Sequence, residues 1–170
     1  AMASYLGLGA APGERLAEAV EQKLAIPVLF VDMPEGISGV AAQIAGGEAI
    51  LINRQESLGR QTFDLAHELF HVLTWDAMPP ERVDRGNPSN YKAKKVEQLA
   101  DNFAAALLMP AGDIVAKWER KDEARPLEDW IVSAANLYRV SPPAVVWRLV
   151  ALGKLKKNDA EKLIPSLPSF

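Results

Sequence analysis

Residues 63–73 read FDLAHELFHVL. This stretch is apolar almost all round, except at Asp64, His67, Glu68 and His71. A helix that is hydrophobic on nearly every face is usually buried at the centre of a domain. The pattern therefore predicts a central helix, and everything else in the chain is interpreted around it.

His67 and His71 are the only two histidines of the chain, and they stand four residues apart. Residues four apart share one face of a helix, so both imidazoles can reach one metal ion. Glu68 lies beside them, where a carboxylate can take a proton from water on that ion. The alternative is a core helix that satisfies these side chains without a metal, but a buried glutamate between two imidazoles is costly without a cation.

Two histidines leave a hydrolytic zinc site incomplete, because such sites usually have three protein ligands and one open position. The next long helix offers Glu97, followed one turn later by Asp101. Because these two residues share a face, one can bind the metal while the other accepts a hydrogen bond from a ligand histidine and fixes its orientation. We expect Glu97 to be the metal ligand and Asp101 to orient the histidine. The small residues Ala100, Ala104 and Ala105 let this helix pack closely on the first. The alternative is a solvated glutamate on an ordinary alanine-rich packing face.

Composition excludes several classes of protein. The chain has 170 residues, of which 49% are hydrophobic and 24% are charged, as in ordinary globular proteins. Its net charge of -3 gives no general basic field for gripping nucleic acid, and the lack of cysteine excludes disulfides, thiolate metal sites and a cysteine nucleophile. No uninterrupted apolar run reaches the ~20 residues of a membrane-spanning helix. We therefore expect no membrane partner and a cytoplasmic location.

The first half of the chain mixes helix and strand. Residues 1–12 are small and punctuated by glycine and proline, which is typical of a linker or a cloning remnant. An amphipathic helix is expected from Gly13 and a strand over residues 26–31. Residues 39–45 and 48–53 flank Gly46-Gly47, a hairpin signal, so we expect a small antiparallel sheet of about three strands.

The second half is nearly all helical, which makes α+β the natural class. Residues 76–90 are typical of a loop, and residues 91–109 predict a long helix that Pro110 stops. Residues 129–152 have the order helix, short turn, helix. Reading DNA would need a basic, exposed second helix, and this one offers only Arg148, so direct DNA binding is not expected.

Three stretches resemble the ImmA/IrrE family of metallopeptidases. They are residues 50–53 (ILIN), residues 60–66 (RQTFDLA), which lead into the histidine motif, and residues 97–110 (EQLADNFAAALLMP). The last closely matches the family block E-x-x-A-[ND]-x-F-A-A-x-L-L-M-P and is much more specific than the histidine motif alone.

The resemblance implies a mostly helical, zincin-like α+β fold in which His67, His71 and Glu97 hold zinc and Glu68 is the base. We accordingly expect a zinc metallopeptidase domain over residues 13–125 and a C-terminal helical, helix-turn-helix-like subdomain over residues 126–170, packed on it. Known members cleave helix-turn-helix repressors of the XRE type, which implies a protein substrate and control of stress-response or mobile-element genes. Some members are fused to such a DNA-binding domain, and one hypothesis is that this chain is the peptidase part of such a fusion.

Phe70 departs from the family pattern, which usually has glycine at that place. A bulky ring there is expected to change packing or cleft shape without removing a ligand. A second electrophile normally steadies the oxyanion of peptide hydrolysis. The chain has no third histidine for that task, so the candidates are Tyr91, Tyr138 and an arginine such as Arg60; for each tyrosine the alternative is a half-buried packing residue.

The leading hypothesis is a zinc endopeptidase that cleaves a transcriptional repressor. The alternative is a zinc-binding regulatory or sensor module that binds a partner protein without cleaving it, and a third hypothesis is a DNA-binding adaptor built on residues 129–152. Histidine and carboxylate ligands suit several divalent metals, so manganese is a second candidate beside zinc. Replacing Glu68 by glutamine separates the first two hypotheses, because only a peptidase needs the base.

Overall fold

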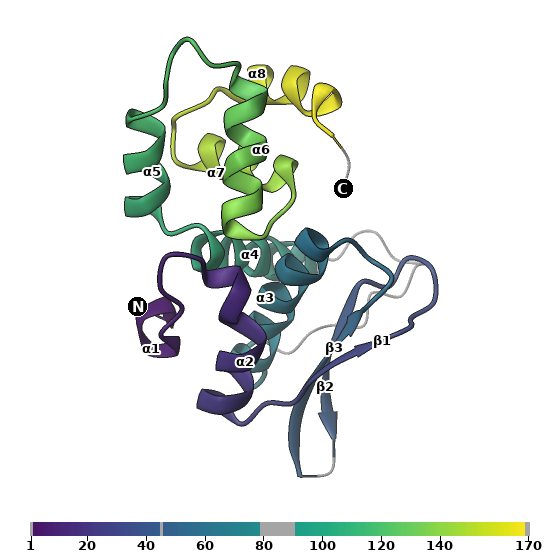
Figure 1. The fold of residues 1–170 in the computed structure, drawn as a ribbon. Coiled ribbons are helices and arrows are strands. Elements are labelled where there is room, and N and C mark those ends of the chain that lie inside the picture. Colours follow the sequence, from purple (N-terminus) through teal and green to yellow (C-terminus); the bar gives the residue numbers. More distant parts are fainter. Residues whose placement is uncertain (1, 45, 79–90, 169–170) are drawn as a thin grey trace.

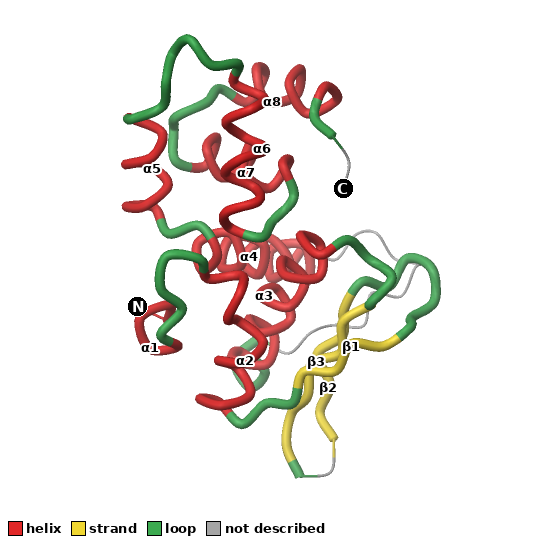
Figure 2. The backbone as a smooth tube through the Cα atoms, in the orientation of Figure 1, coloured by secondary structure: helices red, strands yellow, loops and turns green. Residues whose placement is uncertain are grey.

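The computed structural model describes residues 2–44, 46–78 and 91–168. Within these residues three strands form one small sheet and the other regular elements are helices (Figures 1 and 2). The α+β class predicted from the sequence is therefore confirmed. The helices are α1 (Met2–Leu6), α2 (Pro12–Leu24), α3 (Leu58–Thr74), α4 (Tyr91–Leu108), α5 (Ala111–Glu119), α6 (Leu127–Tyr138), α7 (Pro142–Ala151) and α8 (Lys157–Leu163), followed by a 3-10 turn over Ile164–Ser166.

Helix α3 is the centre of the fold, packed against α2, α4 and two strands of the sheet. The Ser57 hydroxyl accepts a hydrogen bond from the Arg60 amide at 3.4 Å, so the helix begins earlier than the apolar stretch by itself predicts. Leu65 is 3% exposed and Leu69 is fully buried. The prediction of a buried central helix is confirmed.

The sheet is mixed, with β3 (Gly47–Asn53) between β1 (Val28–Val31) and β2 (Gly39–Ile44). Strands β2 and β3 form the predicted antiparallel hairpin, but β1 runs parallel to β3. The predicted antiparallel sheet is therefore wrong for β1. The physical reason is that β2 already occupies one edge of β3 in the hairpin, so β1 can pair only with the other edge. The chain reverses direction between β1 and β2 and again between β2 and β3, so β1 and β3 run the same way.

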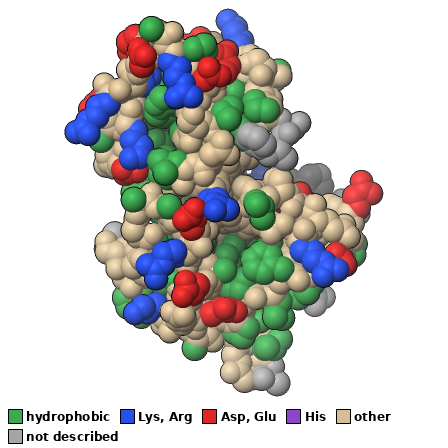
Figure 3. Space-filling view, in the orientation of Figure 1, with side chains coloured by type: hydrophobic (Ala, Val, Ile, Leu, Met, Phe, Trp, Pro, Cys, Tyr) green, Lys and Arg blue, Asp and Glu red, His purple; other side chains and the backbone are tan. Residues whose placement is uncertain are grey.

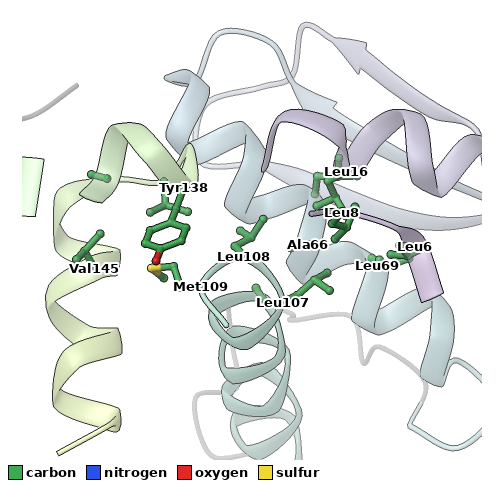
Figure 4. Close-up of a cluster of buried hydrophobic side chains, with 14 of the residues drawn as sticks. Leu6, Leu8, Leu16, Ala66, Leu69, Leu107, Leu108, Met109, Tyr138 and Val145 are labelled. Carbon is green, nitrogen blue, oxygen red and sulfur yellow. The ribbon is translucent and has the colours of Figure 1, made fainter. Parts of the chain in front are cut away.

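The N-terminal residues are part of the core. Leu6 ends helix α1 and is 3% exposed, and Leu8 is 1% exposed. Both join the buried cluster that contains Leu16 of α2 and Leu69 of α3 (Figure 4). The structure thus differs from the linker predicted for residues 1–12, because two leucines among small residues are enough to anchor a short helix on an apolar surface.

The C-terminal helices pack on the end of α4. The Arg148 Nε of α7 donates a hydrogen bond to the Met109 carbonyl at 3.0 Å. Figure 4 shows Tyr138 of α6 directed towards Met109, in the same buried cluster as Leu108 and Val145. One continuous core therefore serves both halves of the chain, and the division at residues 125 and 126 stays a prediction.

Among the described residues, no helix by itself combines the length and apolarity needed to cross a membrane. The segments Lys94–Leu108 and Ala111–Glu119 are long and apolar enough only when they are taken together, and a bend of 62° separates them.

Tyr138 supplies a test of the packing between the C-terminal helices. Its buried hydroxyl donates a hydrogen bond to Asp113 Oδ2 at 2.6 Å. Tyr138→Phe should lower the free energy of unfolding by about 1–2 kcal/mol, since the bond goes to a charged acceptor. Urea denaturation measures the change, and Tyr5→Phe, at a residue 62% exposed, is the matched control. Equal stability of Tyr138→Phe and wild type would contradict the assignment.

Candidate metal centre

Helices α3 and α4 pack against each other and bring three potential metal ligands together. His67 and His71 come from α3, and their Nε2 atoms are 3.2 Å apart. Glu97 comes from α4 and faces both, with Oε2 3.2 Å from His67 Nε2 and Oε1 3.5 Å from His71 Nε2. One donor atom from each of the three residues lies within 4.8 Å of the other two, so the group could hold a metal ion.

The spacing of these donors suits a small divalent ion. Zinc bonds of 2.0–2.2 Å at tetrahedral angles set ligand atoms about 3.3–3.5 Å apart. The two distances of 3.2 Å, between the histidine Nε2 atoms and from His67 Nε2 to Glu97 Oε2, are close to these values, and the distance of 3.5 Å from His71 is to the other carboxylate oxygen, Oε1. Two ring nitrogens and a carboxylate that converge in this way are also the donor types that zinc binds.

His71 presents one ring nitrogen to the donor group. Its side chain is only 4% exposed, and its Nδ1 is buried without a hydrogen-bond partner in the described part of the chain. The polar contacts of the ring are thus made through Nε2, on the side that faces His67 and Glu97. Nε2 is therefore the nitrogen that would bind a metal ion, while Nδ1 points away from the donor group.

Asp101 holds His67 from the other side of the ring. Its Oδ1 lies 2.9 Å from His67 Nδ1. Burial by itself lowers the pKa of His67, but the hydrogen bonds to Asp101 and Glu97 outweigh burial and raise the pKa to about 10. The same histidines lower the pKa of Glu97 to about 2 through their hydrogen bonds. Without a metal, the pair is therefore an imidazolium and a carboxylate at neutral pH.

Glu68 reaches from α3 to the sheet while it stays close enough to His67, His71 and Glu97 to interact with their charges. Its Oε2 accepts a hydrogen bond from the Ala41 amide of β2 at 2.7 Å. Burial raises the pKa of Glu68, while the two neighbouring imidazoles and the Ala41 amide oppose that rise. The sequence carries no signal for the contact with Ala41, because it joins residues that are far apart in the chain.

Phe70 packs between the two helices that carry the donors. It is 9% exposed, and its ring centroid lies 5.7 Å from that of Phe103 on α4. The same ring stands edge-on to His71, also at 5.7 Å between centroids. The ring therefore lies in the α3–α4 interface beside a candidate ligand, and its effect relative to a glycine stays a prediction.

The residues considered for oxyanion stabilisation are placed differently. Arg60 Nε lies 3.2 Å from Asp64 Oδ2, and its Nη2 lies 3.3 Å from Ser38 Oγ, so the guanidinium contacts these groups and not the donor cluster. Tyr138 is buried against Asp113, which excludes it from the site. The side chain of Tyr91 lies outside the described part of the structure.

The fold and the donor set define a helix-rich α+β protein with two histidines and a carboxylate converging between adjacent helices. Comparison with protein families assigns it more closely: residues 21–150 match the model of Peptidase_M78, the IrrE N-terminal-like domain. The chain belongs to this family. Membership supports a metallopeptidase-type or regulator-related role.

Similar solved structures share the fold. One is a Mycobacterium tuberculosis transcriptional regulator, which is 21% identical in sequence and superposes with a TM-score of 0.62. The similarity covers 88% of this chain but only 44% of the regulator, so the chain spans less than half of that protein's length. No curated protein matches this sequence.

Glu97 and Asp101 can be tested by metal binding. Glu97→Ala removes one of three donors and should sharply reduce bound zinc while the fold persists. Asp101→Ala should weaken zinc binding by about 10–100-fold, because it removes the acceptor that orients His67. Competition titration with a chelator measures both, with the exposed Asp159→Ala as control. Unchanged zinc affinity in Glu97→Ala would remove Glu97 from the site.

The protonation of His67 predicts how metal affinity depends on pH. His67 has a pKa of about 10 without metal and must lose its proton before Nε2 can bind an ion. Apparent zinc affinity should therefore rise roughly tenfold per pH unit between about pH 7 and pH 9. Calorimetry in buffers of different ionisation enthalpy measures the released proton, and a flat profile would contradict the prediction.

The metal-free protein should show the opposite trend in stability. A folded-state pKa of about 10, above the ordinary 6.5, stabilises the fold fully below pH 6.5. That contribution is lost as the pH rises through 10, so the free energy of unfolding of the metal-free protein should fall over this range.

Proposed function

We propose that this chain is a zinc-dependent endopeptidase. The observation that carries the proposal is the convergence of His67, His71 and Glu97, with Glu68 next to a donor in the sequence. Membership of a peptidase family supports the same conclusion independently of the geometry.

The three donors would hold the ion through the two Nε2 atoms and the Glu97 carboxylate. When bound, zinc supplies a Lewis acid that lowers the pKa of water to about 7 and polarises a carbonyl group. Manganese suits the same donors. Asp101 prepares His67 for this task, because an Nδ1–H that donates to Asp101 leaves the Nε2 lone pair available.

Glu68 is the proposed general base. Its raised pKa brings the carboxylate nearer to the range in which a group both accepts and returns a proton close to neutral pH. Glu68 takes a proton from the attacking water while the water oxygen bonds to the peptide carbonyl carbon. It then gives that proton to the leaving nitrogen as the C–N bond breaks, which yields a new carboxylate and a new amine.

We further propose that the substrate is a helix-turn-helix transcriptional repressor of the XRE type, cleaved to regulate stress-response or mobile-element genes. The IrrE-like family supports a link to regulation, and a protein of similar fold is described as a transcriptional regulator. This chain corresponds to less than half of that regulator. The similarity therefore supports a role in transcriptional regulation, and the terminus search described below identifies the substrate.

The competing candidate is a zinc-binding module that binds a partner protein without cleaving it. The observation in its favour is the hydrogen bond from the Ala41 amide, which engages one oxygen of the proposed base. In that case Glu68 would be a structural residue of the α3–β2 contact. A catalytic role for Glu68 is therefore the point on which the two candidates differ.

A DNA-reading role for helices α6 and α7 has less support. Val145, Val146 and Leu149 of α7 are fully buried, and Arg148 donates its Nε to the Met109 carbonyl. On the face seen in Figure 3, basic side chains are interspersed with acidic ones and form no continuous basic surface. Neither feature suits a helix that must lie in the major groove.

The decisive experiment is a search for new peptide termini. Zinc-loaded wild type and Glu68→Gln are incubated with a lysate of the source cell, and new N-termini are identified by mass spectrometry. We expect new termini in a few DNA-binding regulators with wild type and none with Glu68→Gln, because the amide cannot accept the proton. Glu35→Gln, at an exposed position, should cleave like wild type.

Identical termini from wild type and Glu68→Gln, with zinc bound to both, would contradict the peptidase. That result would favour the binding module.

A further inference from the structure

We propose that strand β2 positions the Glu68 carboxylate through its backbone alone, and that Gly39 is the positioning residue that makes this contact sterically possible. The inference rests on the proposed function for its catalytic meaning. The contact between β2 and Glu68 can nevertheless be measured without any cleavage assay.

The hydrogen-bond pattern of the hairpin directs the Ala41 amide away from the sheet. The Asn53 amide donates to the Ser38 carbonyl at 2.8 Å, so Ser38 and Asn53 form a hydrogen-bonded pair. Hydrogen-bonded and non-hydrogen-bonded pairs alternate along antiparallel strands. Gly39, Ala41 and Gln43 are therefore in non-hydrogen-bonded pairs, and their N–H and C=O groups point away from β3. Because β2 is an edge of the sheet, that side is the free edge.

Glu68 takes up this free-edge donor. Its side chain reaches from α3 to the Ala41 amide, and Oε2 accepts the hydrogen bond at 2.7 Å. A bond from an amide to a charged carboxylate is short and stronger than a bond between neutral groups. It fixes the direction of Oε2 and leaves Oε1 turned to the Gly39 side of the strand.

Gly39 provides the space for this arrangement. A Cβ at this position would lie 2.9 Å from Glu68 Cγ, 3.2 Å from Glu68 Oε1 and 3.3 Å from Ile52 Cδ1. The backbone of Gly39 is not in the left-handed region, so glycine is not required there for its conformational freedom. What the position requires is the absence of a side chain next to the proposed base.

The chain offers a matched control for this requirement. Gly112 in α5 also has an ordinary backbone conformation, and a Cβ built on it meets nothing within 4 Å. Gly112→Ala therefore makes the same chemical change without a clash. Any effect that is seen in Gly39→Ala and absent in Gly112→Ala comes from the contact with Glu68 and Ile52.

The experiment measures amide hydrogen exchange of Ala41 in zinc-loaded, 15N-labelled protein by NMR. Wild type should protect Ala41 although it lies on a free edge, and Glu68→Ala defines its rate without the acceptor. Gly39→Ala should raise the Ala41 exchange rate roughly tenfold or more towards that of Glu68→Ala, and Gly112→Ala should leave it unchanged. The amide of Gln43, which faces the same edge, is the internal reference.

Two results would overturn the proposal. One is an Ala41 amide that exchanges equally fast in wild type and in Glu68→Ala, because Glu68 would then not hold it. The other is a Gly39→Ala protein with wild-type protection at Ala41. Thermal melting and zinc content are measured on every variant, so that loss of fold or metal is recognised.

A second variant keeps the test valid if Gly39→Ala does not fold. Ala41→Pro removes the donor itself and puts the ring Cδ in the direction of Glu68 Oε2, at a nitrogen that makes no hydrogen bond within the sheet. With oxidised insulin B chain as the probe, both variants should lower kcat by about 100-fold with little change in KM or bound zinc. Wild-type kcat in both folded variants would contradict a role in catalysis.

Failure of the proposed function would look different. If wild type leaves the insulin chain and every lysate protein intact, the peptidase assignment fails while the Ala41 exchange rates still decide whether β2 holds Glu68.

Discussion

The packing of α3 on α4 is the interaction on which the rest of the structure depends. It brings Glu97 within 3.5 Å of the Nε2 atoms of two histidines, which local sequence spacing alone cannot do. Fully buried Ala100 and Ala104 allow the close approach, and Phe70 and Phe103 fill the interface beside it. The same interface therefore serves as hydrophobic core and as scaffold for the donors, so its packing and the geometry of the site are coupled.

Electrostatics make this site self-compensating without a metal. Burial lowers the pKa of His67, but hydrogen bonds to Asp101 and Glu97 raise it to about 10, and hydrogen bonds from the two histidines lower the pKa of Glu97 to about 2. An ion that enters replaces the proton of an imidazole by a positive charge of its own. The donors thus keep a cation among them in either state, which avoids the cost of an uncompensated carboxylate in a partly buried place.

The small sheet matters for the site more than its size indicates. Strand β2 covers the side of α3 that carries Glu68, and it contributes a backbone donor at Ala41 and empty space at Gly39. The proposed base thus lies between a helix that carries the metal donors and a strand that holds its carboxylate. Gly39 can therefore affect the proposed base although it has no side chain, because it leaves the space that Glu68 needs to reach the Ala41 amide.

Local periodicity in the sequence is enough to predict several features of the protein. The spacing of four puts His67 and His71 on one face of a helix, and the same spacing relates Glu97 to Asp101. The hairpin and the α+β class follow from short-range patterns of the same kind. Long-range packing sets the parallel pairing of β1, the anchoring of Leu6 and Leu8, the contact of Arg60 with Ser38, and the contact between Glu68 and Ala41. These depend on which surfaces meet in space, because distant segments compete for the same edge, apolar face or partner, and no local pattern encodes the outcome of that competition.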